Sequence, residues 1–236
     1  MSDALIDRID RLAEQGVHHY RALRTTLVAS TQQAASLTPS PATRRQLHRT
    51  LRYLINVSRG GFKAQVMLGT RALTLEALNA VELDTGLTLD DEVRGNLIKL
   101  AESHARGVAD DFYHQALRDA RALEEQIRYF AIRSAIAASK FDTSLERGAR
   151  FVKISESPDK VINRAGRRID ASKALSLLLR GHYRSVYADT FVFAAQYLGF
   201  ARFETDQGDV FTALDYANAR NKLFHPNSKR LIRIQK

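Results

Sequence analysis

The feature that most constrains this chain is the long stretch from Asp90 to Lys140, which contains no proline and only two glycines, Gly95 and Gly107. Apolar residues recur through it at three- and four-residue spacing, which is the period of one face of an α-helix. They are Leu97, Leu100, Val108, Phe112, Leu117, Leu123, Ile127, Phe130 and Ile136. The pattern predicts one or two long helices, which need other helices to cover their apolar side.

The same spacing predicts helices in most of the remaining sequence. The predicted segments are residues 3–35, Arg44 to Ser58, Phe62 to Leu83, Ala171 to Leu198 and Val210 to Phe224. Gly16 is a candidate interruption of the first segment, and Arg59-Gly-Gly61 is expected to separate the second from the third. Phe151-Val-Lys-Ile154 is a candidate strand, and the basic, alternating tail from Lys229 to Lys236 is expected to form either a short edge strand or an arm that orders on RNA. We therefore expect an all-α fold, a multi-helix bundle with room for one small β element.

Two polar stretches divide the sequence. Leu37-Thr-Pro-Ser-Pro-Ala42 is the clearest linker of the first half, and Thr43 is the expected cap of the helix after it. The second boundary runs from Lys140 to Asp170, and Asp170 is suited to cap the next helix. We predict an N-terminal helical region at residues 1–150, with long helices and a hairpin arm. A basic C-terminal helical region is predicted at residues 151–236.

The composition excludes several classes of protein. A chain of 236 residues that is 44% hydrophobic can build a substantial core, so global disorder is not expected. The sequence has no cysteine, which excludes disulfides and thiolate metal sites and fits a reducing compartment. Acidic residues at Asp3 and Asp7, with no apolar run after them, argue against a signal peptide. No run of about 18 apolar residues occurs, so we expect no membrane contact and a cytoplasmic location.

The net charge is +10, and most of the excess lies in the last third of the chain. Residues 1–160 hold 23 Lys+Arg and 20 Asp+Glu, whereas residues 161–236 hold 13 and 6. A concentrated positive region favours a polyanionic partner, and the leading interpretation is nucleic acid, with RNA favoured. A partner protein with an acidic surface is the alternative.

The candidate nucleic-acid-binding residues form three groups. Four arginines of the helix predicted from Arg44 lie largely opposite its apolar residues, a pattern that fits phosphate contact and fits a solvated face equally well. These are Arg44, Arg45, Arg49 and Arg52. The second boundary contributes Arg164, Arg167 and Arg168, and the end of the chain contributes Lys222, Lys229, Arg230 and Arg233.

Metal and cofactor chemistry finds little support in the sequence. Asp111 and His114 stand three residues apart, which is the local geometry of one half of a helical carboxylate and histidine metal site. No second pair of this kind occurs, and the chain has neither a phosphate-binding loop nor a dinucleotide-binding fingerprint. We therefore expect no metal and no cofactor.

Near the end of the sequence, Arg220-Asn-Lys-Leu-Phe-His225 precedes Pro226, which is expected to stop a helix there. Asn221 and His225 are four residues apart and would share one helical face, with Arg220 beside it. Metal-free cleavage of RNA needs a base of near-neutral pKa for the 2′-hydroxyl and a fixed cation for the phosphate. Histidine and arginine supply these two functions, and asparagine can hold the imidazole or a phosphate oxygen. Basic residues near a helix C-terminus are also common for structural reasons alone.

This segment resembles the R-x4-6-H motif of the HEPN superfamily, whose all-helical domains include many metal-independent endoribonucleases of bacterial defence and toxin systems. The resemblance covers residues 220–225 and their helical context. It implies that His225 is the acid and base, that Arg220 stabilises charge on the phosphate, and that Asn221 positions the reacting groups. It also implies a homodimer, because such domains pair two motifs across one cleft and this chain has one.

The alternative interpretation is a non-catalytic, basic helical subunit of a larger assembly that contains nucleic acid. A ribonucleoprotein effector complex and a phage head are the two candidate assemblies. In this class the long helices bind neighbouring subunits and nucleic acid, and His225 is structural only. The two interpretations differ in one requirement, since a nuclease needs Arg220 and His225 exposed together.

Overall fold

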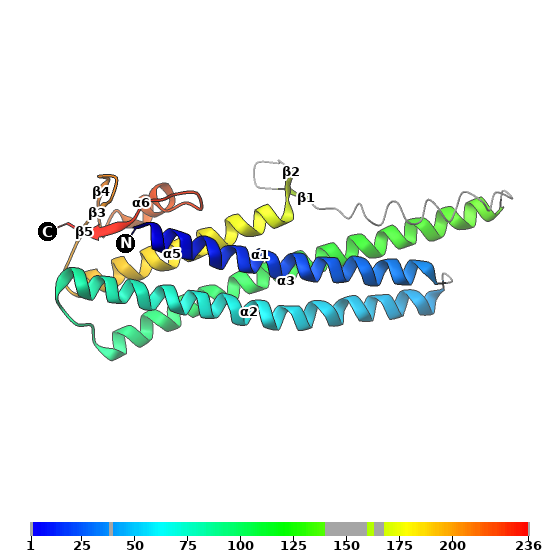
Figure 1. Ribbon diagram of the computed structural model, residues 1–236, viewed down its shortest axis with the longest axis horizontal. Coiled ribbons are helices and arrows are strands. Elements are labelled where there is room, and N and C mark those ends of the chain that lie inside the picture. The colour runs from blue at the N-terminus through cyan, green and yellow to red at the C-terminus, as the bar shows by residue number, and fades with distance from the viewer. Residues whose placement is uncertain (1, 38–39, 140–159, 163–167, 236) are drawn as a thin grey trace. The chain divides into compact units, whose positions relative to one another are not determined.

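The computed structural model describes residues 2–37, 40–139, 160–162 and 168–235, and it confirms the predicted all-α bundle with a small β element (Figure 1). The helices are α1 (Ser2–Ser36), α2 (Pro41–Thr85), α3 (Asp91–Ser139), α5 (Ala171–Tyr197) and α6 (Tyr216–Leu223). The strands are β1 (Lys160–Ile162), β2 (Arg168–Asp170), β3 (Arg202–Thr205), β4 (Val210–Thr212) and β5 (Ile232–Ile234). The strand predicted at residues 151–154 lies outside the described residues.

The chain divides into two compact units, each assembled from separate stretches of sequence. The first unit comprises Met1–Val17, Phe62–Ala109 and Leu175–Lys236, and the second comprises His18–Gly61 and Asp110–Ala174. The three longest helices, α1, α2 and α3, contribute residues to both. The units therefore do not follow one another along the chain as two consecutive blocks.

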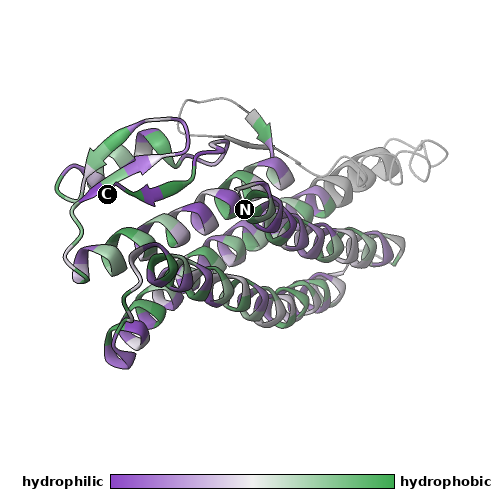
Figure 2. Ribbon diagram, turned by 60° about the vertical axis from the view of Figure 1, so that its left-hand side comes forward, coloured by the Kyte–Doolittle hydropathy of each residue, from purple (hydrophilic) through white to green (hydrophobic). Residues whose placement is uncertain are grey.

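The long helices are amphipathic, and their glycines do not interrupt them. Each carries apolar and polar residues on different sides, as the alternating colours along the ribbons show (Figure 2). The expected break at Arg59-Gly-Gly61 is wrong, because α2 runs through it without a gap. Gly16 does not break α1 either. A Cβ at Gly16 would lie 2.4 Å from Cδ1 of Leu179. That glycine gives α1 the room to approach α5 closely.

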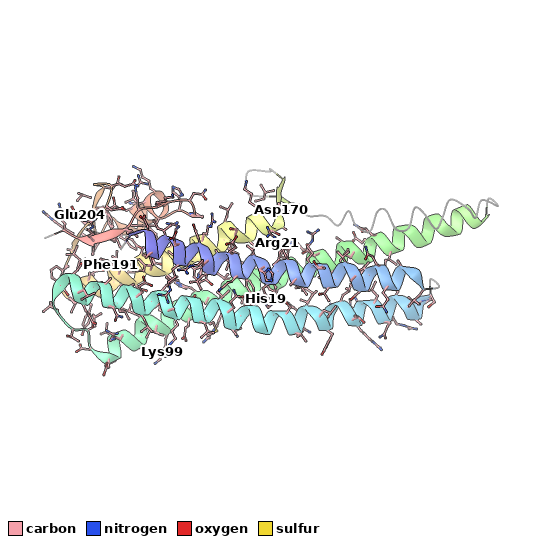
Figure 3. All side chains as sticks on the ribbon, viewed as in Figure 1. His19, Arg21, Lys99, Asp170, Phe191 and Glu204 are labelled. Carbon is pink, nitrogen blue, oxygen red and sulfur yellow. The ribbon has the colours of Figure 1, made fainter. Side chains whose placement is uncertain are left out.

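The helix ends show which cap predictions hold. The predicted cap Thr43 is wrong: Ser40 Oγ accepts a hydrogen bond from the Thr43 backbone N–H at 3.0 Å, and Pro41 begins α2. Asp170, which is labelled in Figure 3, caps α5 as predicted, because its Oδ1 accepts from the Lys173 N–H at 2.9 Å. After α5, Gly199 has a φ of +92°, which a residue without Cβ adopts readily.

A small sheet with strand order β4-β3-β5 follows α5. Both neighbours pair with β3 in antiparallel fashion, and Phe203 lies opposite Phe211 on one side and Ile234 on the other. The tail therefore forms an edge strand, as one interpretation of the sequence predicted. The helix predicted from Val210 is wrong in its first part, because Val210–Thr212 is β4 and α6 begins only at Tyr216. Alternation over three residues was too short a signal to outweigh the helical period.

The core of the first unit explains why this C-terminal segment folds against α5. Phe211 stacks on Phe203 with ring centroids 5.6 Å apart and meets Phe224 edge-on at 6.2 Å. These rings are buried together with Phe191 of α5 and with Tyr216, the first residue of α6. Burial of so many aromatic side chains is the main stabilising contribution to this region. It fixes the position of α6 and of the residues that follow it.

The second unit has a core of its own, with one buried polar pair. Leu51, Ile55 and Leu123 are fully enclosed. Tyr20 donates a hydrogen bond of 2.6 Å to Asp119, and both side chains are buried. Burial is the largest cause of the raised pKa of Asp119. Across the described part of the chain, no helix is long and apolar enough to cross a membrane.

Candidate functional site

The predicted catalytic residues do not lie on one helix. Arg220 is in α6, but α6 ends at Leu223, and the capping residue Phe224 has already left helical geometry with φ −113° and ψ 34°. His225 therefore lies beyond the helix. The prediction that Asn221 and His225 share one helical face is wrong. Two causes are evident: the residue before Pro226 is disfavoured in helical geometry, and Phe224 turns into the aromatic core. The side chain of Asn221 lies outside those that the structure describes.

The Arg220 guanidinium is bound to a carboxylate of α5. Its Nη2 donates to Oδ2 of Asp189 at 2.7 Å, and the hydroxyl of Tyr216 donates to Oδ1 of the same carboxylate at 2.6 Å. Burial raises the pKa of Asp189, although both hydrogen bonds and the Arg220 charge oppose that rise. Asp189 thus joins the first residue and the middle of α6 to α5, and Arg220 has a structural role in this contact. The Arg220 side chain still keeps 38% of its surface exposed.

His225 is exposed, and its ring orientation is determined by the backbone that follows it. The Asn227 N–H donates to Nδ1 of His225 at 3.2 Å. A backbone N–H can only donate, so Nδ1 is the acceptor and the ring proton of the neutral imidazole is on Nε2. In this arrangement Nε2 can donate a proton to a ligand. The imidazole would have to move its proton from Nε2 to Nδ1 before Nε2 could act as a base.

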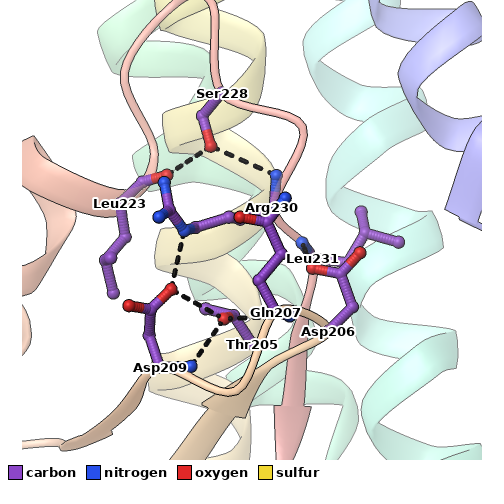
Figure 4. A network of polar contacts seen from close by, with 8 residues as sticks. All are labelled: Thr205, Asp206, Gln207, Asp209, Leu223, Ser228, Arg230 and Leu231. Carbon is purple, nitrogen blue, oxygen red and sulfur yellow. Dashed lines mark hydrogen bonds and ion pairs between the residues drawn. The ribbon is translucent and has the colours of Figure 1, made fainter.

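The loop that carries His225 is held by several contacts (Figure 4). Ser228 Oγ donates to the Leu223 carbonyl oxygen and accepts from the Arg230 N–H, and the Ser228 N–H donates to the His225 carbonyl at 2.8 Å. Pro226 packs on α5, where its Cγ lies 3.1 Å from the place a Cβ would occupy on Gly181. His225 is therefore presented on a well-anchored loop.

Most of the predicted basic residues at the C-terminal end have acidic neighbours. Arg230 Nε binds Asp209 Oδ2 at 2.7 Å (Figure 4), and this contact is the main cause of the lowered pKa of Asp209. The charge of Lys222 acts on the same carboxylate. Arg233 lies opposite Glu204 in the pair of β3 and β5. Of this group, Arg230 alone forms an ion pair with a described residue, whereas Lys222, Lys229 and Arg233 are exposed and form none among the described residues.

The loop arginines give no information on binding. Arg164 and Arg167 lie outside the described residues, and Arg168 is described by its backbone in β2 but not by its side chain.

The predicted arginine group of α2 has a different environment. We call Arg44, Arg45, Arg49 and Arg52 the α2 arginine face. All four side chains are exposed, whereas the buried side of this segment is formed by Leu47, Leu51 and Ile55. Within the described part of the chain, none of the four forms an ion pair or a side-chain hydrogen bond. His48, in the same segment of α2, binds Glu124 at 2.8 Å.

Two residues of interest escaped the sequence analysis. Tyr53, one residue after the α2 arginine face, keeps 68% of its surface exposed. Its signal was an aromatic residue beside arginines on the polar side of a predicted helix. Asp189 is the sole acid of α5, and a lone carboxylate in a strongly apolar helix is a signal for a buried polar partner.

Among the described residues, no group of three or more His, Asp or Glu side chains is arranged to hold a metal ion. Comparison of the chain with protein-family models, with curated proteins and with solved structures finds no match.

Proposed function

We propose that this protein binds nucleic acid, with RNA favoured, through the α2 arginine face. The observation that supports this most is the exposure of four arginines on one helix segment, with no acidic partner among the described residues. An arginine without a partner keeps its full charge and its planar fork for a phosphate. Arginines that serve the fold generally have a carboxylate beside them, as Arg220 and Arg230 do.

The arrangement of the four arginines suits a phosphate backbone. Arg44 and Arg52 are eight residues apart, which corresponds to about 12 Å along a helix. On an ideal helix the four side chains project within an arc of about 140°, so one strand can reach all of them. Their guanidinium groups are on flexible stems, which allows contact without regard to sequence. We therefore expect binding that is tight at low salt and weakens steeply as salt is added.

Tyr53 adds a preference for unpaired bases. It is exposed and directly follows Arg52, so a base can stack on its ring while the neighbouring phosphate is bound. Base stacking on an aromatic side chain does not depend on sequence, because every base has a π-face. A base inside a duplex is already stacked on its neighbours. A single-stranded region is the substrate that this combination of residues accommodates best.

The test is the affinity for a fluorescently labelled single-stranded RNA at several salt concentrations. Replacement of all four arginines by glutamine should weaken binding at least about tenfold, equivalent to about 1.4 kcal/mol. If all four contact phosphates, the slope of log K against log salt should decrease by about 3, since each contact on a single strand contributes about 0.7.

A matched control separates this surface from net charge. Four other exposed arginines on helices are available for the same substitution: Arg21, Arg71, Arg106 and Arg121. Their glutamine variant loses the same charge and should retain most of the affinity and of the salt slope. Equal losses in the two variants would show that binding follows net charge alone, and the assignment to the α2 arginine face would then be wrong.

Metal-independent RNA cleavage by Arg220 and His225 is a second candidate function. It is favoured by the exposure of His225 on an anchored loop directly after the helix that bears Arg220. RNA incubated with the protein in EDTA should then be cleaved by wild type and left intact by His225→Ala and Arg220→Ala. If RNA is bound but never cut, the protein is a non-catalytic binding subunit, as in a larger assembly. A homodimer is expected only in the catalytic case.

A further inference from the structure

Arg184 of α5 is a buried arginine without a hydrogen bond from its side chain to any residue that the structure describes. Only 7% of its surface is exposed, and its Nε is enclosed without a partner among the described residues. No described group accepts a hydrogen bond from its guanidinium. Arginine is almost never this buried unless a carboxylate, a phosphate or a carbonyl oxygen satisfies its fork. The guanidinium of Arg184 therefore lacks the hydrogen-bond acceptor that a buried arginine normally has.

The neighbours of Arg184 leave the cluster positively charged. Arg180, one turn earlier on the same face of α5, has its Nε 3.1 Å from Oδ1 of Asp10 in α1. Asp10 and Arg180 are the charged groups that act on Arg184, and its pKa is lowered mainly by burial. Two guanidinium groups therefore share one carboxylate. The excess of one positive charge has no counterpart in the described residues.

The cluster also has an open side. Asp10 and Arg180 keep 40% and 36% of their side-chain surfaces exposed, so they form the outer part of the cluster and Arg184 the inner part. The backbones are held firmly here, because Gly16 brings α1 against Leu179 of α5. Pro226 packs on Gly181, between the two arginines in sequence. The backbone that carries both arginines is thus held in place on each side.

We propose that Arg184 and Arg180 form a binding site for a phosphate group. Two arginines at i and i+4 offer planar forks that match the oxygens of a phosphate, and a phosphate supplies the negative charge that the cluster lacks. Asp10 holds Arg180 in place through their ion pair. Its negative charge also disfavours the binding of a second phosphate group beside the first. The source of the phosphate is either a small phosphate compound or the backbone of a nucleic acid. This site uses none of the residues of the α2 arginine face.

The first experiment uses inorganic phosphate as the probe. Wild type is titrated with phosphate by calorimetry, and its Tm is measured in phosphate and in chloride at equal ionic strength. We expect saturable binding and a Tm that is higher in phosphate. Arg184→Met, which retains the volume of the stem, should lose about tenfold or more in phosphate affinity, since a hydrogen bond to a charged group is of this size. Arg21→Met is the matched control with an exposed arginine and should behave as wild type.

Two readouts keep the proposal open to refutation. If wild type shows no binding, or if Arg184→Met binds phosphate as well as wild type, the site does not exist. If Arg184→Met does not fold, Arg184→Lys retains the charge without the fork, and it should fold with a weaker phosphate response. An unchanged response in that variant would overturn the proposal equally.

A second experiment distinguishes the two sources of phosphate. If the site holds a phosphate of RNA, Arg184→Met should lower the salt slope of RNA binding by about 0.7, and free phosphate should compete with RNA. If the site holds a small phosphate compound, RNA binding should be unaffected while the effect of phosphate on Tm is lost. Loss of RNA binding in the variant of the α2 arginine face with phosphate binding intact would show that the two proposals stand or fall separately.

Discussion

The α2 arginine face and the C-terminal segment are both rich in basic residues, but their cations have different surroundings. In the C-terminal segment Arg220 binds Asp189 and Arg230 binds Asp209, so both arginines are neutralised within the fold. The four arginines of the α2 arginine face have no such partners among the described residues. The region with the larger net charge in the sequence therefore contains arginines that serve the structure. Local pairing, rather than net charge, indicates where a polyanion can bind.

The largest effect is expected at Asp189, where the comparison predicts a loss of stability. Asp189→Ala leaves the Tyr216 hydroxyl and the Arg220 guanidinium without their shared acceptor, and Asp189 exposes only 15% of its side chain. Removing one partner of such a contact should cost about 3 kcal/mol of unfolding free energy. Denaturation in urea measures this directly. Glu204→Ala removes an acid from the nearby sheet and is the control, with an expected change within about 0.5 kcal/mol.

That prediction sharpens the contrast because the α2 arginine face should behave in the opposite way. Its four-glutamine variant should unfold within about 1 kcal/mol of wild type, since it removes no ion pair or side-chain hydrogen bond among the described residues. A destabilised α2 variant, or an unchanged Asp189→Ala, would remove the distinction between structural and free cations on which the proposed function rests.

The second largest effect is expected at Tyr53, which would show that the α2 surface does more than attract charge. Tyr53→Ala should weaken the binding of single-stranded RNA by about 1 to 2 kcal/mol through the loss of base stacking. Binding to a duplex of the same length should change little, because its bases are already stacked. Parallel titrations with the two RNAs give the comparison, and Tyr53→Phe should retain the affinity of wild type. Equal losses of affinity for both RNAs would show that Tyr53 does not act by base stacking.

The sequence predicted the helices better than it predicted the contacts between side chains. The helical period was sufficient to locate α3 and α5, and Asp170 was identified correctly as a cap. Gly60 and Gly61 led to the wrong prediction of a helix break, because packing keeps α2 helical through a stretch of low helix propensity. Tertiary contacts commonly outweigh helix propensity. The strands β3 and β4 were missed because each is too short for alternation to be recognised.

The site predictions had a different limit. The sequence located Arg220 and the α2 arginines correctly as polar positions on helices, but pairing depends on residues distant in sequence. Asp189 and Arg220 meet only because Phe211, Tyr216 and Phe224 pack α6 against α5. No local pattern contains this information. The end of α6 at Leu223, which separates Arg220 from His225, depends on the same aromatic core.

A smaller effect is expected when exposed cations of the C-terminal segment are removed. The combined variant Lys222→Gln, Lys229→Gln and Arg233→Gln should lose less than about tenfold in RNA affinity, because the charge of Lys222 acts on Asp209 and Arg233 lies opposite Glu204 in the sheet. The measurement is the same RNA titration as for the α2 variant. A loss as large as that of the α2 variant would show that pairing within the fold does not prevent these cations from binding RNA. The binding surface would then have to include both regions.

The smallest effect concerns the Arg230 and Asp209 pair, and it appears only in acid. The hydrogen bond from Arg230 lowers the pKa of Asp209 below its ordinary value of 3.8, so the unfolded chain binds a proton more readily than the folded one. This contribution to stability is complete above that value and is lost as the pH falls through the lower, folded pKa. Arg230→Gln should therefore unfold with a shallower pH dependence below about pH 4 than wild type does. Arg202→Gln, which removes an exposed cation of the same sheet, should keep the wild-type slope. If both variants retain that slope, the pair contributes no more than a solvated surface contact, and Arg230 belongs with the free cations.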